Sequence, residues 1–387
     1  MSGDLLSDGH PDFDPDIGPP PPIENTRLQG HGEGEQVLLD AYNSGRLHHA
    51  WLITGPKGIG KATLAHRFAR FILANGKKGA QNGGGPSLFG DALPATDPTS
   101  LHVGSENPVY SRIVAGGHAD MLVIERRINE KTGKLKTVID VDSVRKVGGF
   151  LQLTPAEGGW RVVVIDSADE MNTNSANAVL KVLEEPPKNA LMILVSHNPG
   201  RLLPTIRSRC RTLKLRPLAP DMVSGLVQTY APGVSAQDAA RLAALSDGSI
   251  GHALGLMEEG GLELYAELLS LLHTLPRLNV PALHALADKV ARAGADGAFH
   301  TVTGLLRWWL ERMILTAAGK APEGSGMADD EALFMAGLAS QASLDRWFLV
   351  WEKINHLVAR TDGLNLDKKQ IVLDAFLGLE STVQAAR

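Results

Sequence analysis

The fold of this chain is decided by one stretch, His48-His-Ala-Trp-Leu-Ile-Thr-Gly-Pro-Lys-Gly-Ile-Gly-Lys61. Its first half is a short apolar run of the kind that forms a buried parallel strand. Its second half, from Gly55 onward, has the spacing of a phosphate-binding loop. Apolar residues at helical spacing over 64–72 then predict an amphipathic helix. A strand, a glycine loop and a helix in this order form the structural context that supports such a loop.

Glycines in the loop let the backbone curl so that several N–H groups point at one anion, and a lysine reaches the outer phosphates. The next residue is Ala62, where a Ser or Thr would hold Mg²⁺. Thr63 comes one residue late, about 100° further round the helix, so we do not expect it to replace that hydroxyl. The sequence leaves open whether the loop binds ATP with Mg²⁺. The loop residues that would contact the nucleotide are Gly55, Gly58, Gly60 and Lys61.

A second apolar run, Val162-Val-Val-Ile165, ends in Asp166. An Asp at the end of such a strand can contact Mg²⁺ directly or through water, and the alternative is that it only caps a helix. The next residue is Ser167, which cannot act as a general base. Asp169 and Glu170 follow, and we expect neither to serve as the base. The chain should therefore hydrolyse a nucleotide poorly, and its function should lie in what it does to a neighbour.

The composition is that of a soluble globular protein. The chain has 387 residues, of which 43% are apolar and 21% charged, enough for two or three domains. The net charge of −5 argues against a protein that coats nucleic acid over its whole surface. The single cysteine, Cys210, excludes an intramolecular disulfide, and we interpret it as a small buried residue. Without a long apolar run or a signal-peptide pattern, we expect a cytoplasmic location and no membrane partner.

Apolar runs alternate with helical patterns up to residue 216, which predicts an α/β fold with a five-stranded parallel sheet. Beyond Pro217 the pattern is all-helical. We expect a helix with Asp142 as its N-cap. The predicted parts are a disordered tail over 1–24, a nucleotide-binding domain over 25–216 with a flexible insertion over 76–111, a small helical domain over 217–278 and a further helical domain over 279–387.

The segment 201–216 carries six basic residues and no acidic one. One of them, Arg209, lies in Ser208-Arg-Cys210, directly before a predicted strand. One interpretation is that these residues form a solvent-exposed basic surface. The more specific interpretation is that the guanidinium of Arg209 contacts a phosphate, in this subunit or in the next one.

Two further runs are more specific: VVVIDSADEMNTNSANAVLKVLEEPP over 162–187 and NPGRLLPTIRSRC over 198–210. With them, the chain from about residue 25 resembles the AAA+ clamp-loader family of bacterial DNA polymerase III. The resemblance implies an AAA+ P-loop domain, a small helical lid over 217–278, and a helical collar over 279–387. In that family the collar binds other subunits in a ring of five.

The resemblance also implies roles for single residues. The arginine of the family's Ser-Arg-Cys motif acts in trans as a finger on the ATP of an adjacent motor subunit, and it falls on Arg209. A motor subunit would have Glu at the position of Ser167 and Arg at the position of Gly251. Together with Ala62, these departures indicate a non-hydrolysing stator that assists motor subunits.

The partners that the resemblance implies are the gamma/tau motor subunits, the delta subunit, the sliding clamp and primed DNA. Many relatives carry a four-cysteine zinc module, but the corresponding region here has no cysteine, so we expect no zinc. Two alternatives stay open. The chain could be a motor subunit with its own weak ATPase, using Lys61, Thr63 and Asp166, or a nucleic-acid-binding module that uses the segment 201–216.

Overall fold

The computed structural model describes residues 18–76, 97–129, 133, 135–292, 294–320, 329–364 and 366–385. The chain forms two compact units, Met1–Leu218 and Ala219–Arg387. The boundary lies two residues after the predicted end of the nucleotide-binding domain. The division of the second unit into a lid and a collar stays a prediction.

The first unit is built on a parallel sheet of five strands, in the order β2-β3-β4-β1-β5. This confirms the predicted α/β fold and its sheet. Because all strands run in one direction, their carboxyl ends lie at one edge of the sheet, the carboxyl edge, and their amino ends at the opposite edge, the amino edge. The strands are β1 (Ala50–Thr54), β2 (Met121–Ile124), β3 (Arg161–Ile165), β4 (Ala190–Ser196) and β5 (Arg211–Lys214).

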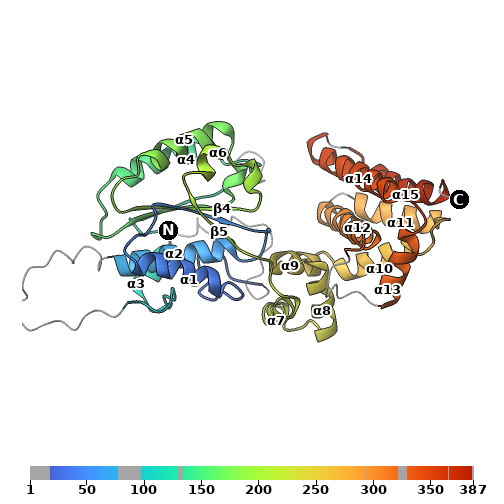
Figure 1. The fold of residues 1–387 in the computed structure, drawn as a ribbon, viewed down its shortest axis with the longest axis horizontal. Coiled ribbons are helices and arrows are strands. Elements are labelled where there is room, and N and C mark those ends of the chain that lie inside the picture. Colours follow the sequence, from blue (N-terminus) through green and yellow to red (C-terminus); the bar gives the residue numbers. More distant parts are fainter. Residues whose placement is uncertain are drawn as a thin grey trace, which may run out of the picture. The chain divides into compact units, whose positions relative to one another are not determined.

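Helices cover both faces of this sheet (Figure 1). Two hydrophobic clusters, one on each face, fix the layers. Short 3₁₀ turns, η2 (Ala168–Glu170) and η3 (Pro199–Arg201), follow β3 and β4. One face is covered by α1 (Gly32–Asn43), α2 (Lys61–Asn75) and α3 (Pro108–Val114), and the other by α4 (Val141–Gln152), α5 (Thr173–Glu184) and α6 (Pro204–Arg207).

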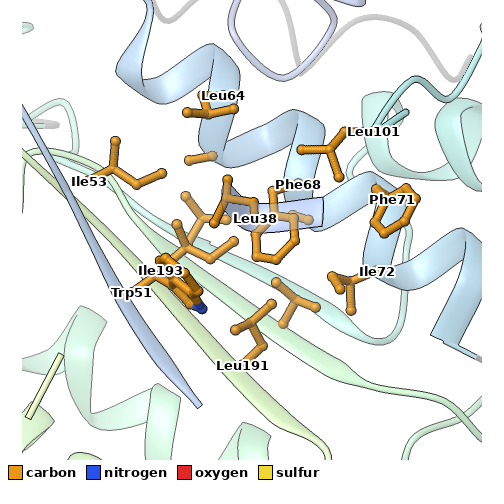
Figure 2. Packing of buried hydrophobic residues seen from close by; sticks show 14 of the residues in the cluster. Leu38, Trp51, Ile53, Leu64, Phe68, Phe71, Ile72, Leu101, Leu191 and Ile193 are labelled. Atoms are coloured by element: carbon orange, nitrogen blue, oxygen red, sulfur yellow. The ribbon is translucent and has the colours of Figure 1, made fainter. Parts of the chain in front are cut away.

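The amphipathic helix after the loop packs as its sequence predicts. Phe68 and Ile72 of α2 are fully buried against Trp51 and Ile193 of the sheet, as Figure 2 shows. The rings of Trp51 and Phe68 meet edge to face, with their centroids 6.4 Å apart. Burying side chains of this size contributes about 1.5–3 kcal/mol each. The loop before α2 therefore rests on a firmly packed helix.

The second unit is all-helical in its described residues, as predicted. Trp308, Trp309 and Trp347 are buried, so these large side chains pack in the interior of this unit. No helix of the described chain is both long and apolar enough to span a membrane. The helices are α7 (Pro220–Tyr230), α8 (Ala236–Leu245), α9 (Ile250–Glu258), α10 (Gly261–Leu272), α11 (Val280–Ala291), α12 (Asp296–Ala317), α13 (Asp329–Ala339), α14 (Leu344–Leu364) and α15 (Lys368–Gln384).

The predicted disordered tail extends too far. Residues 1–17 lie outside the described residues, but residues 18–24 pack on the first unit. The carbonyl of Ile23 accepts a hydrogen bond of 2.6 Å from the buried guanidinium of Arg70, on α2. A buried arginine needs such acceptors, and the segment before residue 25 supplies one of them.

The predicted insertion over 76–111 also has a different end. Residues 77–96 lie outside the described residues. Leu101 and Val109 are buried in the core beside α2, and α3 already begins at Pro108. The packed chain therefore resumes before residue 101, because these apolar side chains complete the core. The expected N-cap of α4 is displaced as well: it is Asp140, whose carboxylate accepts from the N–H of Ser143 at 2.9 Å, and not Asp142.

The connection from β1 to α2 requires glycine. Gly55 has a φ of +148°, and a Cβ placed there would lie 2.7 Å from the carbonyl oxygen of Leu215 and 2.9 Å from Cδ1 of Ile59. Real Cβ atoms do not approach a backbone oxygen so closely. Glycine is therefore required at position 55, because Leu215, directly after β5, leaves no room for a side chain there.

We therefore expect Gly55→Ala to lower the free energy of unfolding by about 1–3 kcal/mol, because the backbone must move to admit the methyl group. Urea denaturation of the two proteins measures the difference. Gly149→Ala is the matched control, since its Cβ would meet open space on helix α4. Equal stability of Gly55→Ala and the parent chain would contradict the contact with Leu215.

The imidazole of His66, in α2, is buried, and its Nδ1 finds no hydrogen-bond partner in the described part of the chain. Burial, with a smaller contribution from the charge of Arg70, lowers the pKa of His66 to about 4 from its usual 6.5. The unfolded state therefore binds the proton between these values, while the folded state does not. The free energy of unfolding is therefore not reduced by His66 above pH 6.5, and it falls as the pH drops from 6.5 toward 4.

When the pH is lowered from 7 to 5, His66 takes up a proton in the unfolded state but not in the folded state. We expect this to lower the free energy of unfolding by about 2 kcal/mol. Urea denaturation at both pH values, on the parent chain and on His66→Leu, measures its share. The variant should lose less stability on acidification. His102→Leu, at an exposed position, should keep the parent's pH dependence. An identical pH dependence for the parent chain and His66→Leu would show that this imidazole does not titrate on unfolding.

Candidate functional site

Lys61 is the first residue of α2, directly after the loop, and its side chain is only 6% exposed. Its ammonium donates a hydrogen bond to the carbonyl of Pro56 within the loop. Burial lowers the pKa of Lys61 to about 8, and the carboxylates of Asp166 and Asp169 oppose this shift. A phosphate group in the loop would favour the charged lysine in the same way.

The two other glycines of the loop have positive φ angles, +77° at Gly58 and +102° at Gly60. Gly60 is also confined, because a Cβ there would lie 3.1 Å from Cδ1 of Leu28. His31 supports the loop from the same side: its Nε2 donates to the carbonyl of Ile59 at 2.6 Å. The loop thus has the curled backbone that lets successive N–H groups face an anion.

Asp166 directly follows β3 at the carboxyl edge, where the loop also begins, so the structure brings Asp166 and Lys61 together. Burial raises the pKa of the Asp166 carboxyl, while the Ser167 backbone N–H and the charge of Lys61 lower it. Ala62 offers no hydroxyl, and Thr63 is buried within α2. These residues fit a phosphate group, but the hydroxyl ligand for a Mg²⁺ ion is missing.

The residues after Asp166 are engaged elsewhere. Ser167 has a left-handed backbone, with a φ of +53°. The buried carboxylate of Asp169 accepts from the backbone N–H groups of His197 and Asn198, each at 3.2 Å, and lies 3.2 Å from Nε2 of His197. It joins η2 to the turn after β4. Sequence reasoning missed this partnership, because nothing in the pattern links two segments 28 residues apart.

Arg209 lies between α6 and β5, with about a third of its side chain exposed. Its Nη2 is 2.8 Å from Oε1 of Glu184, the last residue of α5. Its Nη1 donates to the carbonyl of Thr205 at 3.0 Å. Glu184 belongs to the Leu-Glu-Glu-Pro-Pro run, but no local pattern indicates that it would meet Arg209.

Arg209 and the loop lie at opposite edges of the same sheet. In the β1–β5 pair, Trp51 is level with Arg211, and Arg209 lies two residues before it, on the side of the amino edge. Its guanidinium meets Glu184, and the preceding residue, Leu183, accepts a hydrogen bond from His49, directly before β1. The loop begins after Thr54, at the carboxyl edge. The six residue steps from His49 to Gly55, at about 3.3 Å each, separate the two ends of β1 by about 20 Å. The guanidinium therefore does not serve the loop of its own chain.

The rest of the basic segment is exposed, so DNA contact through it stays a prediction. Arg211 lies with its guanidinium 4.8 Å from the ring centroid of Trp51. Cys210 is buried, and burial raises the pKa of its thiol to about 12, which agrees with its interpretation as a buried apolar residue. The exposed basic residues are Arg201, Arg207, Arg211, Lys214 and Arg216.

The part of the chain that holds this site is similar to a known protein family. Residues 30–219 match the family model described as DNA polymerase III, delta subunit. DNA polymerase III subunit delta' of Pseudomonas aeruginosa is 38% identical over 162 residues, which are 42% of this chain and 41% of that protein. The delta' subunit of Escherichia coli is 33% identical over 225 residues, 58% of each chain.

A DNA polymerase III gamma subunit, from Buchnera aphidicola, is 27% identical over 250 residues, 64% of this chain and 60% of that protein. The chain thus spans 41–60% of the length of these three relatives. The matched residues hold the loop, Asp166 and Arg209. Residues 30–219 therefore belong to the family described as DNA polymerase III, delta subunit, and bacterial delta' subunits are relatives of this chain.

Proposed function

We propose that this chain is a delta'-type stator of the DNA polymerase III clamp loader. In this proposal it is a non-hydrolysing AAA+ subunit that supplies Arg209 in trans to a neighbouring motor subunit. The motor subunits are of the gamma/tau kind, and the complex loads the sliding clamp on primed DNA during replication. The remaining implied partner is the delta subunit, and the place of action is the cytoplasm.

The observation that carries the proposal is the position of Arg209. Its guanidinium is exposed in part and meets Glu184 near His49 at the amino edge, and the loop of its own chain begins about 20 Å further along β1. A phosphate that Arg209 contacts must therefore belong to another molecule. The planar fork of a guanidinium matches phosphate oxygens, as an arginine finger requires.

The chain's own loop supports the non-hydrolysing half of the proposal. Lys61 and the three glycines could still hold the phosphates of ATP, which would bring a labile phosphate bond to the loop. Yet Ala62 cannot bind Mg²⁺, and Ser167 cannot activate a water molecule. Asp169, the nearest carboxylate after Asp166, is buried against the turn that follows β4.

The test is ATP turnover by reconstituted motor subunits with delta, clamp and primed DNA, in the presence of this chain or of Arg209→Ala. We expect Arg209→Ala to reduce turnover at the neighbouring site by about 10³-fold or more, because arginine fingers stabilise the charge of the transition state by that much. Arg209→Lys should recover little of the rate, since an ammonium lacks the bidentate fork.

Arg207→Ala is the matched control: it removes an exposed arginine two residues away from Arg209, and turnover should be unchanged. Size-exclusion chromatography must show that every variant assembles. Equal turnover with Arg209→Ala and the parent chain, in fully assembled complexes, would reduce this chain to a scaffold.

The alternative is a motor subunit with its own ATPase, favoured by the meeting of Lys61 and Asp166 at the carboxyl edge. It requires that the purified chain turn over ATP and that Lys61→Ala abolish the turnover. We expect no turnover by the purified chain, with or without Lys61→Ala, because the hydroxyl ligand of Mg²⁺ and the base are absent. Phosphate release measured with a coupled assay decides between the two, and turnover that depends on Lys61 would contradict our proposal.

A further inference from the structure

Glu184 occupies a place where its charge is unfavourable. It is the last residue of α5, and Glu185 follows it as the C-cap. The carbonyl groups at the end of a helix carry partial negative charge, so cations are preferred there and carboxylates are disfavoured. Two consecutive acidic residues break this rule. A sequence that breaks a local rule without a gain in stability often does so for a functional reason.

The ion pair between Glu184 and Arg209 offers little stability in return. Both side chains are substantially exposed, 50% for Glu184 and 35% for Arg209. Exposed pairs of this kind contribute little, because water screens the charges and the side chains lose conformational freedom. The pair does, however, fix the direction of the guanidinium.

The end of α5 is a rigid place from which to hold a side chain. The Nε2 of His49 donates to the carbonyl of Leu183 at 3.2 Å, and the carbonyl of His49 accepts from the backbone N–H of Met192 at 2.8 Å. His49 directly precedes β1, so it ties the last turn of α5 to the amino edge of the sheet. Glu184 is thereby held at the amino edge beside Arg209, which comes two residues before β5.

The guanidinium of Arg209 is held by two acceptors and still has N–H groups that neither of them uses. Glu184 takes one N–H of Nη2, and the carbonyl of Thr205 takes one of Nη1. A guanidinium has five N–H groups, so about three remain for an incoming phosphate. An arginine that is already oriented loses less conformational entropy when it meets its target.

From this geometry we infer that Glu184 is a positioning residue for Arg209: it holds the guanidinium in the direction from which it engages the neighbouring subunit's phosphate. The inference rests on the proposed function, because it deepens the role of Arg209. Glu184 itself does not touch the nucleotide in this account. It acts only through the arginine.

The experiment measures ATP turnover by the reconstituted complex with Glu184→Ala, Glu184→Gln, Arg209→Ala and the double variant Glu184→Ala with Arg209→Ala. We expect Glu184→Ala to lower kcat about tenfold, since a misplaced catalytic group costs rate without weakening ATP binding. KM for ATP should stay the same. Glu184→Gln should recover most of the rate, because the amide oxygen still accepts the hydrogen bond.

Two controls separate positioning from a general effect of charge or folding. Glu185→Ala removes the neighbouring carboxylate, which has no ion pair within the described chain, and should leave turnover unchanged. Glu184→Ala should keep the thermal unfolding midpoint of the parent chain or raise it slightly, since it removes an acidic residue from a helix end. In the Arg209→Ala background, Glu184→Ala should have no further effect.

The outcomes distinguish the inference from the proposed function. If Arg209→Ala slows turnover but Glu184→Ala does not, the positioning role is wrong and the proposed function stands. An equal loss from Glu184→Ala in the parent chain and in Arg209→Ala would also overturn the inference, because Glu184 would then act without the arginine. If Arg209→Ala itself has no effect, the proposed function fails.

Discussion

All five strands of the sheet run in the same direction, and the rest of the first unit depends on this constraint. Parallel pairing collects the carboxyl ends of the strands at one edge, where β1 feeds the glycine loop and β3 ends beside Asp166. It collects the amino ends at the other edge, where Arg209 precedes β5. One chain can therefore present the glycine loop at one edge and the partly exposed guanidinium of Arg209 at the opposite edge.

The two edges differ in how they are held. At the carboxyl edge, Lys61 is buried and Asp166 is half-buried, and burial shifts the pKa of each toward its neutral form, while the attraction between the two charges opposes both shifts. At the amino edge, Arg209 and Glu184 remain partly exposed. A guanidinium that must meet another molecule has to stay accessible, whereas a loop that encloses a ligand can be buried. The contrast agrees with the proposed action of Arg209 on another molecule.

Helix α2 links the loop to the rest of the unit. Its apolar side contacts the sheet, while two buried arginines, Arg67 and Arg70, reach the segment before α1. Arg67 donates to Glu35 on α1 at 2.7 Å, and Arg70 donates to backbone carbonyls of residues 23 and 25. Residues 18–26 are therefore part of the packed domain, although their composition resembles that of a tail.

The sequence by itself determined the α/β architecture, the loop and the all-helical second unit, because these follow from local periodicity and from glycine spacing. It also singled out Asp166, which follows an apolar run, and Arg209, which lies in a Ser-Arg-Cys motif before a predicted strand, and the roles of both stay predictions. Only the tertiary structure decided which side chains meet: Glu184 with Arg209, Asp169 with His197, and Arg70 with Ile23. These contacts join segments that are distant in the chain, and such partnerships depend on how helices and strands pack, which no local pattern encodes.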